Sequence, residues 1–333
     1  MPCVGCSAPR PAGSGAIAPE QFASLLNKTL GCPCGTALGM SRSRALDERL
    51  APIGAVLAAA VLFGTTGTSQ ALGPGDATSL GIGAVRLGAG AAALATIAWR
   101  CRPGEGRAWR RHIAMLLLGG VSVAVYQLGW FAGLRRTGVA LGTVVGIGSG
   151  PAMAGLIHLA CGRRGLTRGW LVGTTATVLG AGLLASRGTG KSSVDPVGLL
   201  LTLGAVLGYV LYVEAAQHAI RRGLDAAGTM AGMFGVGAIL LAPILALEPL
   251  GWLASPRGAA MALHLGVVTI GVAYTLYGWG LRYLAVPTVI TLTLAEPLTA
   301  AVLGTVVLGE RIGPMGWLGA ALIATGLLVT ARE

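Results

Sequence analysis

The sequence predicts an all-α integral membrane protein, with ten transmembrane helices arranged as two inverted repeats of five helices each. Three observations support this fold class: a low content of charge, a series of long apolar segments, and an internal similarity between the halves. Of the 333 residues, 54% are hydrophobic and only 11% are charged, and the mean hydropathy is +0.74. A soluble domain carries about 25% charged residues, so this chain has too little charge to cover a surface that faces water.

The apolar residues form ten segments of spanning length, separated by arginine clusters and by glycine or proline. A helix needs about 20 apolar residues to cross a bilayer, and its backbone groups find no partner in hydrocarbon except in their own chain. We therefore expect every segment to be helical. The segments are 51–72, 78–98, 112–134, 138–160, 168–186, 196–216, 227–248, 259–281, 285–308 and 314–331.

The two halves of the chain resemble each other at a nearly constant offset. Five helices in each repeat is an odd number, so the second copy enters the membrane in the opposite orientation. Inverted repeats of this kind are typical of secondary transporters, whose substrate sites lie near the middle of the membrane. We predict repeats at 50–187 and 196–331. The matches are Gly133-Leu134-Arg135 with Gly280-Leu281-Arg282, and Pro151, Gly173 and Gly180 with Pro297, Gly319 and Gly326.

Basic residues explain the formal net charge of +12, and they cluster in the gaps between the apolar segments. They form no stripe along one face, so we expect no nucleic-acid partner. Alternate gaps hold fifteen basic residues on one side of the membrane and six on the other. Because cytoplasmic loops carry the excess of Lys and Arg, we predict a multi-pass protein of a bacterial inner membrane with both termini in the cytoplasm.

The first 49 residues are rich in Gly, Pro, Ser and Ala and are expected to form a disordered tail. Cys3 and Cys6, followed by Cys32 and Cys34, could hold zinc, but no neighbouring secondary-structure pattern supports such a site. We expect no metal and no other cofactor. Met40 begins a more ordinary N-terminus, so translation of residues 1–39 stays an open question.

The last third of the sequence carries motifs of a known family. The chain resembles EamA-type transporters of the drug/metabolite transporter superfamily over about residues 50–331, and Arg86 stands where family members usually carry arginine. The resemblance implies ten helices, two EamA repeats and transport of small metabolites, often outward. The first repeat departs from the pattern, with Ser149-Gly150-Pro151 in place of the Glu-Pro pair. The motifs are Leu294-Ala295-Glu296-Pro297-Leu298, Leu308-Gly309-Glu310, Gly316-Trp317-Leu318-Gly319-Ala320 and Gly326.

Two charged residues lie deep inside predicted spans, where an ionised group costs about 2.5–3.5 kcal/mol on insertion scales. Arg86 has two interpretations: it ties helices together through carbonyl groups, or it contacts an anion in a cavity. Glu296 lies beside Pro297, which removes a backbone hydrogen bond and is a common feature of binding sites. Glu296 is either a group that binds substrate or protons, or a structural cap.

Polar and aromatic residues at helical spacing predict the lining of a substrate cavity. Thr65, Thr68 and Ser69 share one face of the first segment. Two aromatic pairs, with a glutamine beside the first, could stack on an organic substrate and offer it a polar tip, although Tyr and Trp also form interfacial belts. These residues are Tyr126, Trp130 and Gln127, and Tyr274 and Tyr277; Tyr209 and Tyr212 make a third pair whose cavity role is less definite.

These residues together favour a secondary transporter that moves small organic metabolites or drug-like compounds outward by alternating access. Its partners would be the small-molecule substrate, the lipid bilayer and protons as a coupling ion, with no assignment of oligomeric state. The alternative is a membrane-embedded enzyme or a lipid-handling protein. The sequence contains no short motif of a membrane enzyme and no phosphate-binding loop of an ATP-driven pump.

Overall fold

The computed structural model describes residues 42–101, 106–163, 166–185 and 195–332, and within these ranges the regular structure is helical. The first half contains α2 (Arg42–Ala71), α3 (Ser79–Cys101), α4 (Gly106–Arg111), α5 (Ile113–Thr137), α6 (Val139–Ala160) and α7 (Arg168–Ala185). The second half contains α8 (Pro196–Arg221), α9 (Ala226–Leu247), η2 (Gly251–Ala254), α10 (Pro256–Leu263), the π-helix η3 (His264–Val272), α11 (Ala273–Tyr283), α12 (Val286–Leu292), α13 (Ala295–Val306) and α14 (Pro314–Ala331).

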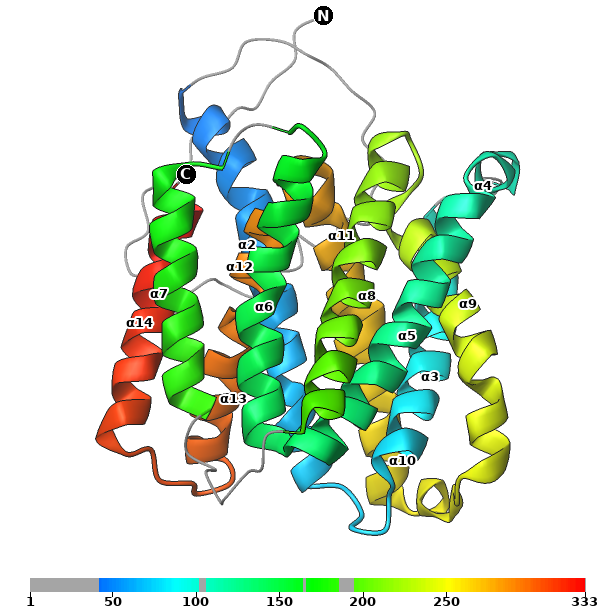
Figure 1. The fold of residues 1–333 in the computed structure, drawn as a ribbon. Helices are drawn as coiled ribbons and strands as arrows, with labels where there is room; N and C mark the ends of the chain where they lie inside the picture. The colour runs from blue at the N-terminus through cyan, green and yellow to red at the C-terminus, as the bar shows by residue number, and fades with distance from the viewer. Residues whose placement is uncertain (1–41, 102–105, 164–165, 186–194, 333) are drawn as a thin grey trace, which may run out of the picture. The chain divides into compact units, whose positions relative to one another are not determined.

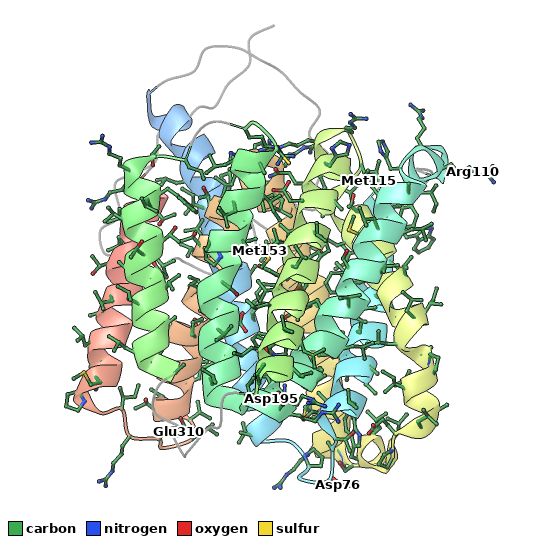
Figure 2. The ribbon with its side chains drawn as sticks, viewed as in Figure 1. Asp76, Arg110, Met115, Met153, Asp195 and Glu310 are labelled. Atoms are coloured by element: carbon green, nitrogen blue, oxygen red, sulfur yellow. The ribbon has the colours of Figure 1, made fainter. Side chains whose placement is uncertain are left out.

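Nine helical segments in the described ranges are long and apolar enough to cross a membrane. The remaining predicted segment, 168–186, forms α7, an 18-residue helix that packs along α14. In Figure 1, α2 begins and α14 ends at the same end of the helical array. Figure 2 shows Asp76, Asp195 and Glu310 at the opposite end, in connections between helices. The predicted all-α membrane fold is confirmed.

The sequence prediction and the structure differ at three places. First, α2 begins at Arg42, inside the stretch 1–49 that the composition assigns to a tail, and the tail cysteines lie outside the described residues. Second, the expected helix at 259–281 contains nine residues of π-helix. Third, the expected helix at 285–308 is interrupted between α12 and α13. The last two irregularities both fall in the second half.

The exposed surface of α5 shows how the helices meet lipid. Leu117, Val121, Val125 and Leu128 form an exposed apolar stripe, while Leu116 on the other side of the helix is buried. A helix whose outer face is this apolar has no favourable contact with water, but it has one with lipid tails. The outer surface therefore fits the hydrocarbon of a bilayer.

Glycines allow α7 and α14 to cross at very short range, and the crossing is symmetric. A methyl group on Gly180 would lie 2.5 Å from the carbonyl oxygen of Gly319, and one on Gly319 would lie 2.6 Å from that of Gly180. Gly173 and Gly326 meet in the same way, seven residues further along each of the two antiparallel helices. The repeat offset maps Gly173 onto Gly319 and Gly180 onto Gly326. Exchanging the two halves therefore maps the contact between Gly180 and Gly319 onto the contact between Gly326 and Gly173. This is the symmetry expected of two inverted repeats.

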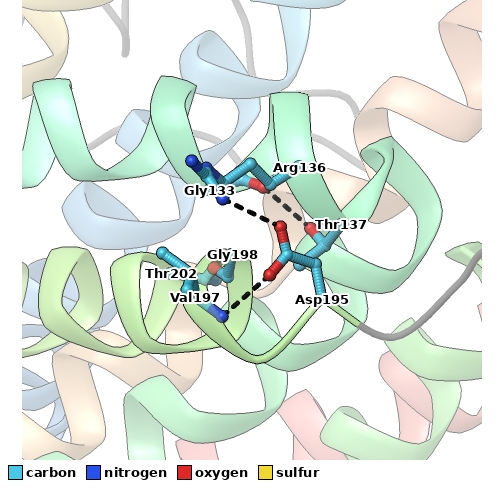
Figure 3. Close-up of polar contacts among 7 residues, drawn as sticks. All are labelled: Gly133, Arg136, Thr137, Asp195, Val197, Gly198 and Thr202. Atoms are coloured by element: carbon cyan, nitrogen blue, oxygen red, sulfur yellow. Dashed lines mark hydrogen bonds and ion pairs between the residues drawn. The ribbon is translucent and has the colours of Figure 1, made fainter.

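A second set of contacts joins the halves where α5 ends and α8 begins (Figure 3). Gly133 lies against Gly198 and Thr202 of α8, and the Asp195 carboxylate caps α8 by accepting from the Val197 amide at 2.9 Å. The same carboxylate pairs with Arg136 of α5 at 3.2 Å. Although desolvation opposes the shift, the amides of Val197 and Gly198 and the Arg136 guanidinium lower the pKa of Asp195. The joint therefore favours an ionised Asp195.

Candidate substrate cavity

A small cavity lies between the two halves of the chain. The first half contributes residues of α3 and α5, and the second half contributes residues of α8, α9, η3 and α11. These six elements belong to five membrane-spanning segments, because η3 and α11 are parts of the one span Pro256–Tyr283, and they converge at the interface where inverted-repeat transporters bind substrate. The lining residues are Arg86, Leu87, Val123, Tyr126, Gln127, Tyr212, Phe234, Ile270 and Tyr274.

Arg86 carries a positive charge into this cavity without a resident partner. It makes no hydrogen bond or ion pair with any residue that the structure describes, and its Nε is buried and unpaired. The interpretation that Arg86 ties helices through their carbonyl groups is therefore wrong for this conformation. A guanidinium group carries five N–H donors and no acceptor. The cavity therefore contains hydrogen-bond donors that no described residue satisfies.

Gln127 supplies a second free donor. Its side chain is only 5% exposed, and its Nε2 has no hydrogen-bond partner among the described residues. Gln127 lies at an ordinary contact distance of 3.7 Å from where a methyl group on Gly83 would stand, whereas the Phe131 ring would lie only 2.9 Å from it. The glycine on α3 thus lets Phe131 of α5 pack closely against α3, beside Gln127.

An aromatic cluster surrounds the cavity, and it is built from both halves. The rings of Tyr126 and Tyr209 are 5.7 Å apart, and those of Phe234 and Tyr274 are 4.3 Å apart. The Tyr212 hydroxyl donates to the Tyr274 hydroxyl at 3.3 Å, and the hydroxyls of Tyr209 and Tyr277 bond at 3.2 Å. The tyrosine hydroxyls are thus largely satisfied by one another, in contrast to Arg86 and Gln127.

Glu296 lies beside a break in the helix that carries it. Pro297 has no N–H to offer the carbonyl of Thr293, and this carbonyl instead accepts from the Glu296 amide at 2.9 Å, in a tighter turn. The Glu296 side chain is exposed, and its charge interacts with Arg86 and with Tyr126 and Tyr209. No ion pair within 4.0 Å joins Glu296 to Arg86 in the described part of the chain. The carboxyl group is therefore near the cavity but is not the counter-ion of Arg86.

The polar face of α2 belongs to a different contact. The Thr65 hydroxyl donates to the Leu62 carbonyl at 2.7 Å and bonds to His264 Nε2 at 2.8 Å. His264 opens the π-helix η3, so this bond links the first half to the second. Thr68 and Ser69 are half-buried on the same helix and do not line the cavity.

Comparison with known proteins identifies the family. The sequence profile of the EamA-like transporter family matches residues 50–186 and again residues 196–332. The chain belongs to the EamA-like transporter family. It is therefore a membrane transporter with two EamA repeats, and the alternative of a membrane-embedded enzyme is excluded.

Two EamA relatives and one solved structure illustrate the range of similarity. The uncharacterized transporter YwfM of Bacillus subtilis (strain 168) is 37% identical over 274 residues, which cover 82% of this chain and 91% of the relative. The threonine/homoserine exporter RhtA of Escherichia coli (strain K12) is 29% identical over 67% of this chain and 72% of its own length. One crystal structure superposes with a TM-score of 0.73 over 84% of this chain and 95% of that chain, at 19% identity, which shows a shared fold.

The structure brings some of the predicted site residues together and leaves others outside. Of the eleven predicted residues, Arg86, Tyr126, Gln127 and Tyr274 line the cavity. Trp130 and Tyr277 lie in the surrounding aromatic cluster, with ring centroids 6.3 Å from Tyr126 and 5.7 Å from Tyr274. Glu296 and Pro297 are at the helix break. The residues that do not reach the lining are Thr65, Thr68, Ser69, Trp130, Tyr277, Glu296 and Pro297.

Sequence reasoning missed Phe234 and the apolar part of the lining. Phe234 is the single aromatic residue in α9, and it packs against both Tyr212 and Tyr274. Because α9 is apolar all round, no periodicity marks the face that meets the cavity. The isolated aromatic residue was the one available signal. Tyr212 did carry a signal, its same-face spacing with Tyr209, but that spacing is equally compatible with an interfacial belt.

Proposed function

We propose that the protein exports small organic metabolites by alternating access, with the cavity between the two repeats as the substrate site. The observation that carries the proposal is the unpaired Arg86 in an aromatic cavity built from both halves. Arg86 is half-buried, and its buried Nε lacks an acceptor among the described residues, which is costly; a bound substrate that supplies an acceptor would remove that cost. Movement of one repeat against the other would then expose the same site to each side of the membrane in turn.

A further feature supports the direction and the substrate size. The relative RhtA is a threonine/homoserine exporter, and its similarity favours outward transport of a compound of amino-acid size here as well. The cavity is small and is closed in by aromatic rings. Its volume of about 10 Å³ in this conformation is close to what one water molecule needs, so the helices must move apart to admit a substrate.

Protons are the proposed coupling ion, and Glu296 is the proposed carrier. Its carboxyl group lies halfway along a span, at a helix break, with Arg86, Tyr126, Tyr209 and Tyr274 as the charged and titratable groups that interact with it. Intramembrane carboxyl groups commonly mark proton pathways. Alternating occupation by substrate and proton would couple export to the proton gradient.

The test compares metabolites released by intact cells. Cells that overproduce the protein should accumulate one or a few small metabolites in the medium relative to cells with an empty vector, as measured by mass spectrometry. Cells that overproduce Glu296→Gln at the same membrane level should not. An unchanged medium in every tested growth condition would contradict export as the function.

The proposed orientation has its own test. Both ends of the described chain lie at the same end of the helical array (Figure 1), and the charge asymmetry assigns this end to the cytoplasm. A reporter fused after Gly223 should then be active in the cytoplasm, and one fused after Gly75 should be active outside. The reverse pair of signals would invert the topology and leave the fold unchanged.

A further inference from the structure

We infer that Arg86 and Gln127 form a carboxylate-binding subsite, so that the transported compound is a carboxylate. The inference rests on the proposed function, because it takes the cavity between the repeats as the transport site. It adds the chemical class of the substrate and the two residues that select it.

The cavity holds buried hydrogen-bond donors that find no acceptor among the residues the structure describes. Arg86 Nε and Gln127 Nε2 are buried N–H donors, both line the same space, and neither has a partner in the described chain. The nearby hydroxyls of Tyr212 and Tyr274 bond to each other and do not relieve them. Buried donors without acceptors are destabilising, so the cavity is complete only when an acceptor enters it.

The donors that line the cavity select the charge of that acceptor. Arginine presents a planar fork of donors that matches the two oxygens of a carboxylate. One guanidinium and one neutral amide supply a single positive charge, which one carboxylate neutralises. A phosphate group at neutral pH carries more negative charge than one guanidinium neutralises. The cavity therefore favours a monoanionic group.

Arg86 has no resident counter-ion among the described residues. Glu296 is the acidic residue whose charge interacts with Arg86, yet the two groups form no ion pair within 4.0 Å in the described part of the chain. The guanidinium is thus free to bind a ligand. The remaining walls are Leu87, Val123, Ile270 and the rings of Phe234 and Tyr274, which suit the apolar part of a small carboxylate.

A carboxylate can reach this cavity from two sources, the aqueous phase or the bilayer. The experiment therefore uses three probe pairs with the purified full-length protein: L-threonine and L-threoninamide, lactate and lactamide, and octanoate and octanamide. Ligand-induced change in the unfolding temperature is the measurement. We expect at least one carboxylate to raise the unfolding temperature while its amide does not, and octanoate acting alone would assign the carboxylate to the bilayer.

Two variants test the residues themselves. Arg86→Gln should raise, about tenfold or more, the carboxylate concentration needed for the same shift of the unfolding temperature. This is the loss of affinity expected for a charge-assisted hydrogen bond. Gln127→Glu places a carboxylate beside Arg86, so it should abolish the response and also raise the unfolding temperature of the ligand-free protein. This second result keeps the test valid even if Arg86→Gln folds poorly. Arg136→Gln, which removes an exposed arginine outside the cavity, is the matched control and should respond as the wild type.

The inference is overturned if no carboxylate raises the unfolding temperature, if each amide acts as strongly as its acid, or if Gln127→Glu still responds. Failure here is distinguishable from failure of the proposed function. If cells export compounds that have no carboxyl group, the protein is an exporter and the subsite is wrong. If cells export nothing while the purified protein still distinguishes acid from amide, the subsite stands without the export function.

Discussion

The two repeats share one fold, but they differ in the charges that they place inside the membrane. The first half supplies Arg86 and Gln127 to the cavity, and the second half supplies Glu296 near it. The counterpart of Glu296 in the first half is Gly150, and offsets of 144 to 147 place the counterpart of Arg86 at uncharged residues 230–233. The two halves thus share the packing of their helices but place groups of opposite charge at or near the cavity.

The helices that carry the repeated proline differ in the same way. Pro151 lies inside the continuous helix α6, whereas Pro297 follows the break between α12 and α13. A glycine precedes the first proline, and a glutamate precedes the second. Glu296 itself lies in α13, and the break falls one turn before Pro297, at Thr293 and Leu294. The repeated proline thus lies in a continuous helix in one half and follows a break in the other, where the carboxyl group lies.

The largest expected effect is on Glu296. Glu296→Gln keeps the size and hydrogen bonding of the side chain but cannot bind and release a proton. In proteoliposomes, we expect this variant to lose transport driven by a pH gradient, while it inserts normally and still binds substrate. A rate and pH profile equal to those of the wild type would remove Glu296 as the coupling site.

The matched control moves the carboxyl group to the other repeat. Gly150 has room for a side chain, since a methyl group there would meet only Ile290 at 3.6 Å. We expect Gly150→Glu combined with Glu296→Gln to remain inactive, because α6 lacks the helix break. Restored transport in the double variant would show that the two halves are interchangeable and would break the comparison.

The symmetric crossing of α7 and α14 should respond equally to changes in either half. Gly180→Leu and Gly326→Leu, at positions that the repeat offset maps onto each other, each force a side chain against a backbone carbonyl of the other helix. We expect each to lower the free energy of unfolding by about 1–3 kcal/mol or more, as measured by unfolding in detergent. Gly204→Leu, at an open position on α8, is the control. A large difference between the first two variants would contradict the inverted symmetry.

The two prolines should behave differently. Pro297→Ala restores an N–H that can bond to the Thr293 carbonyl, so α12 and α13 should become more continuous and transport should fall several-fold. Pro151→Ala should leave transport unchanged and add up to about 1 kcal/mol of stability through one new backbone hydrogen bond. Hydrogen exchange near Thr293 would show whether the break closes. Equal effects of the two changes on transport would mean that the break has no functional role.

The smallest expected effect is at the joint between the repeats. Asp195→Asn should lower the unfolding temperature slightly at neutral pH, since it weakens both the cap of α8 and the pair with Arg136. Because the pKa of Asp195 is lowered in the folded protein, the contribution is present above the ordinary pKa of aspartate and is lost as the pH falls through the folded value. The gap between wild type and variant should therefore close on acidification. Arg136→Gln should produce only part of the effect, because the cap remains.

The sequence alone determined the membrane class, the duplication and the family, because each depends on properties that add up along the chain. Low charge and long apolar segments require a lipid environment whatever the packing. Arg86, Tyr126, Gln127 and Tyr274 could also be predicted, since a polar group inside a span must face the protein interior to avoid lipid. Pro297 indicates a disturbed backbone in this segment, but the sequence does not show that the helix breaks at Thr293.

Tertiary structure alone decided which interior residues meet. Thr65 has the right helical spacing for a cavity, but His264, 199 residues away, bonds to it and holds it elsewhere. Phe234 and Ile270 lie in segments that are apolar all round, so only their neighbours select the face that reaches the cavity. The periodicity and composition of a segment indicate whether its helix lies in lipid. The direction in which a helix faces its neighbours is set by close contacts between distant segments, such as Gly83 with Phe131, that no local pattern contains.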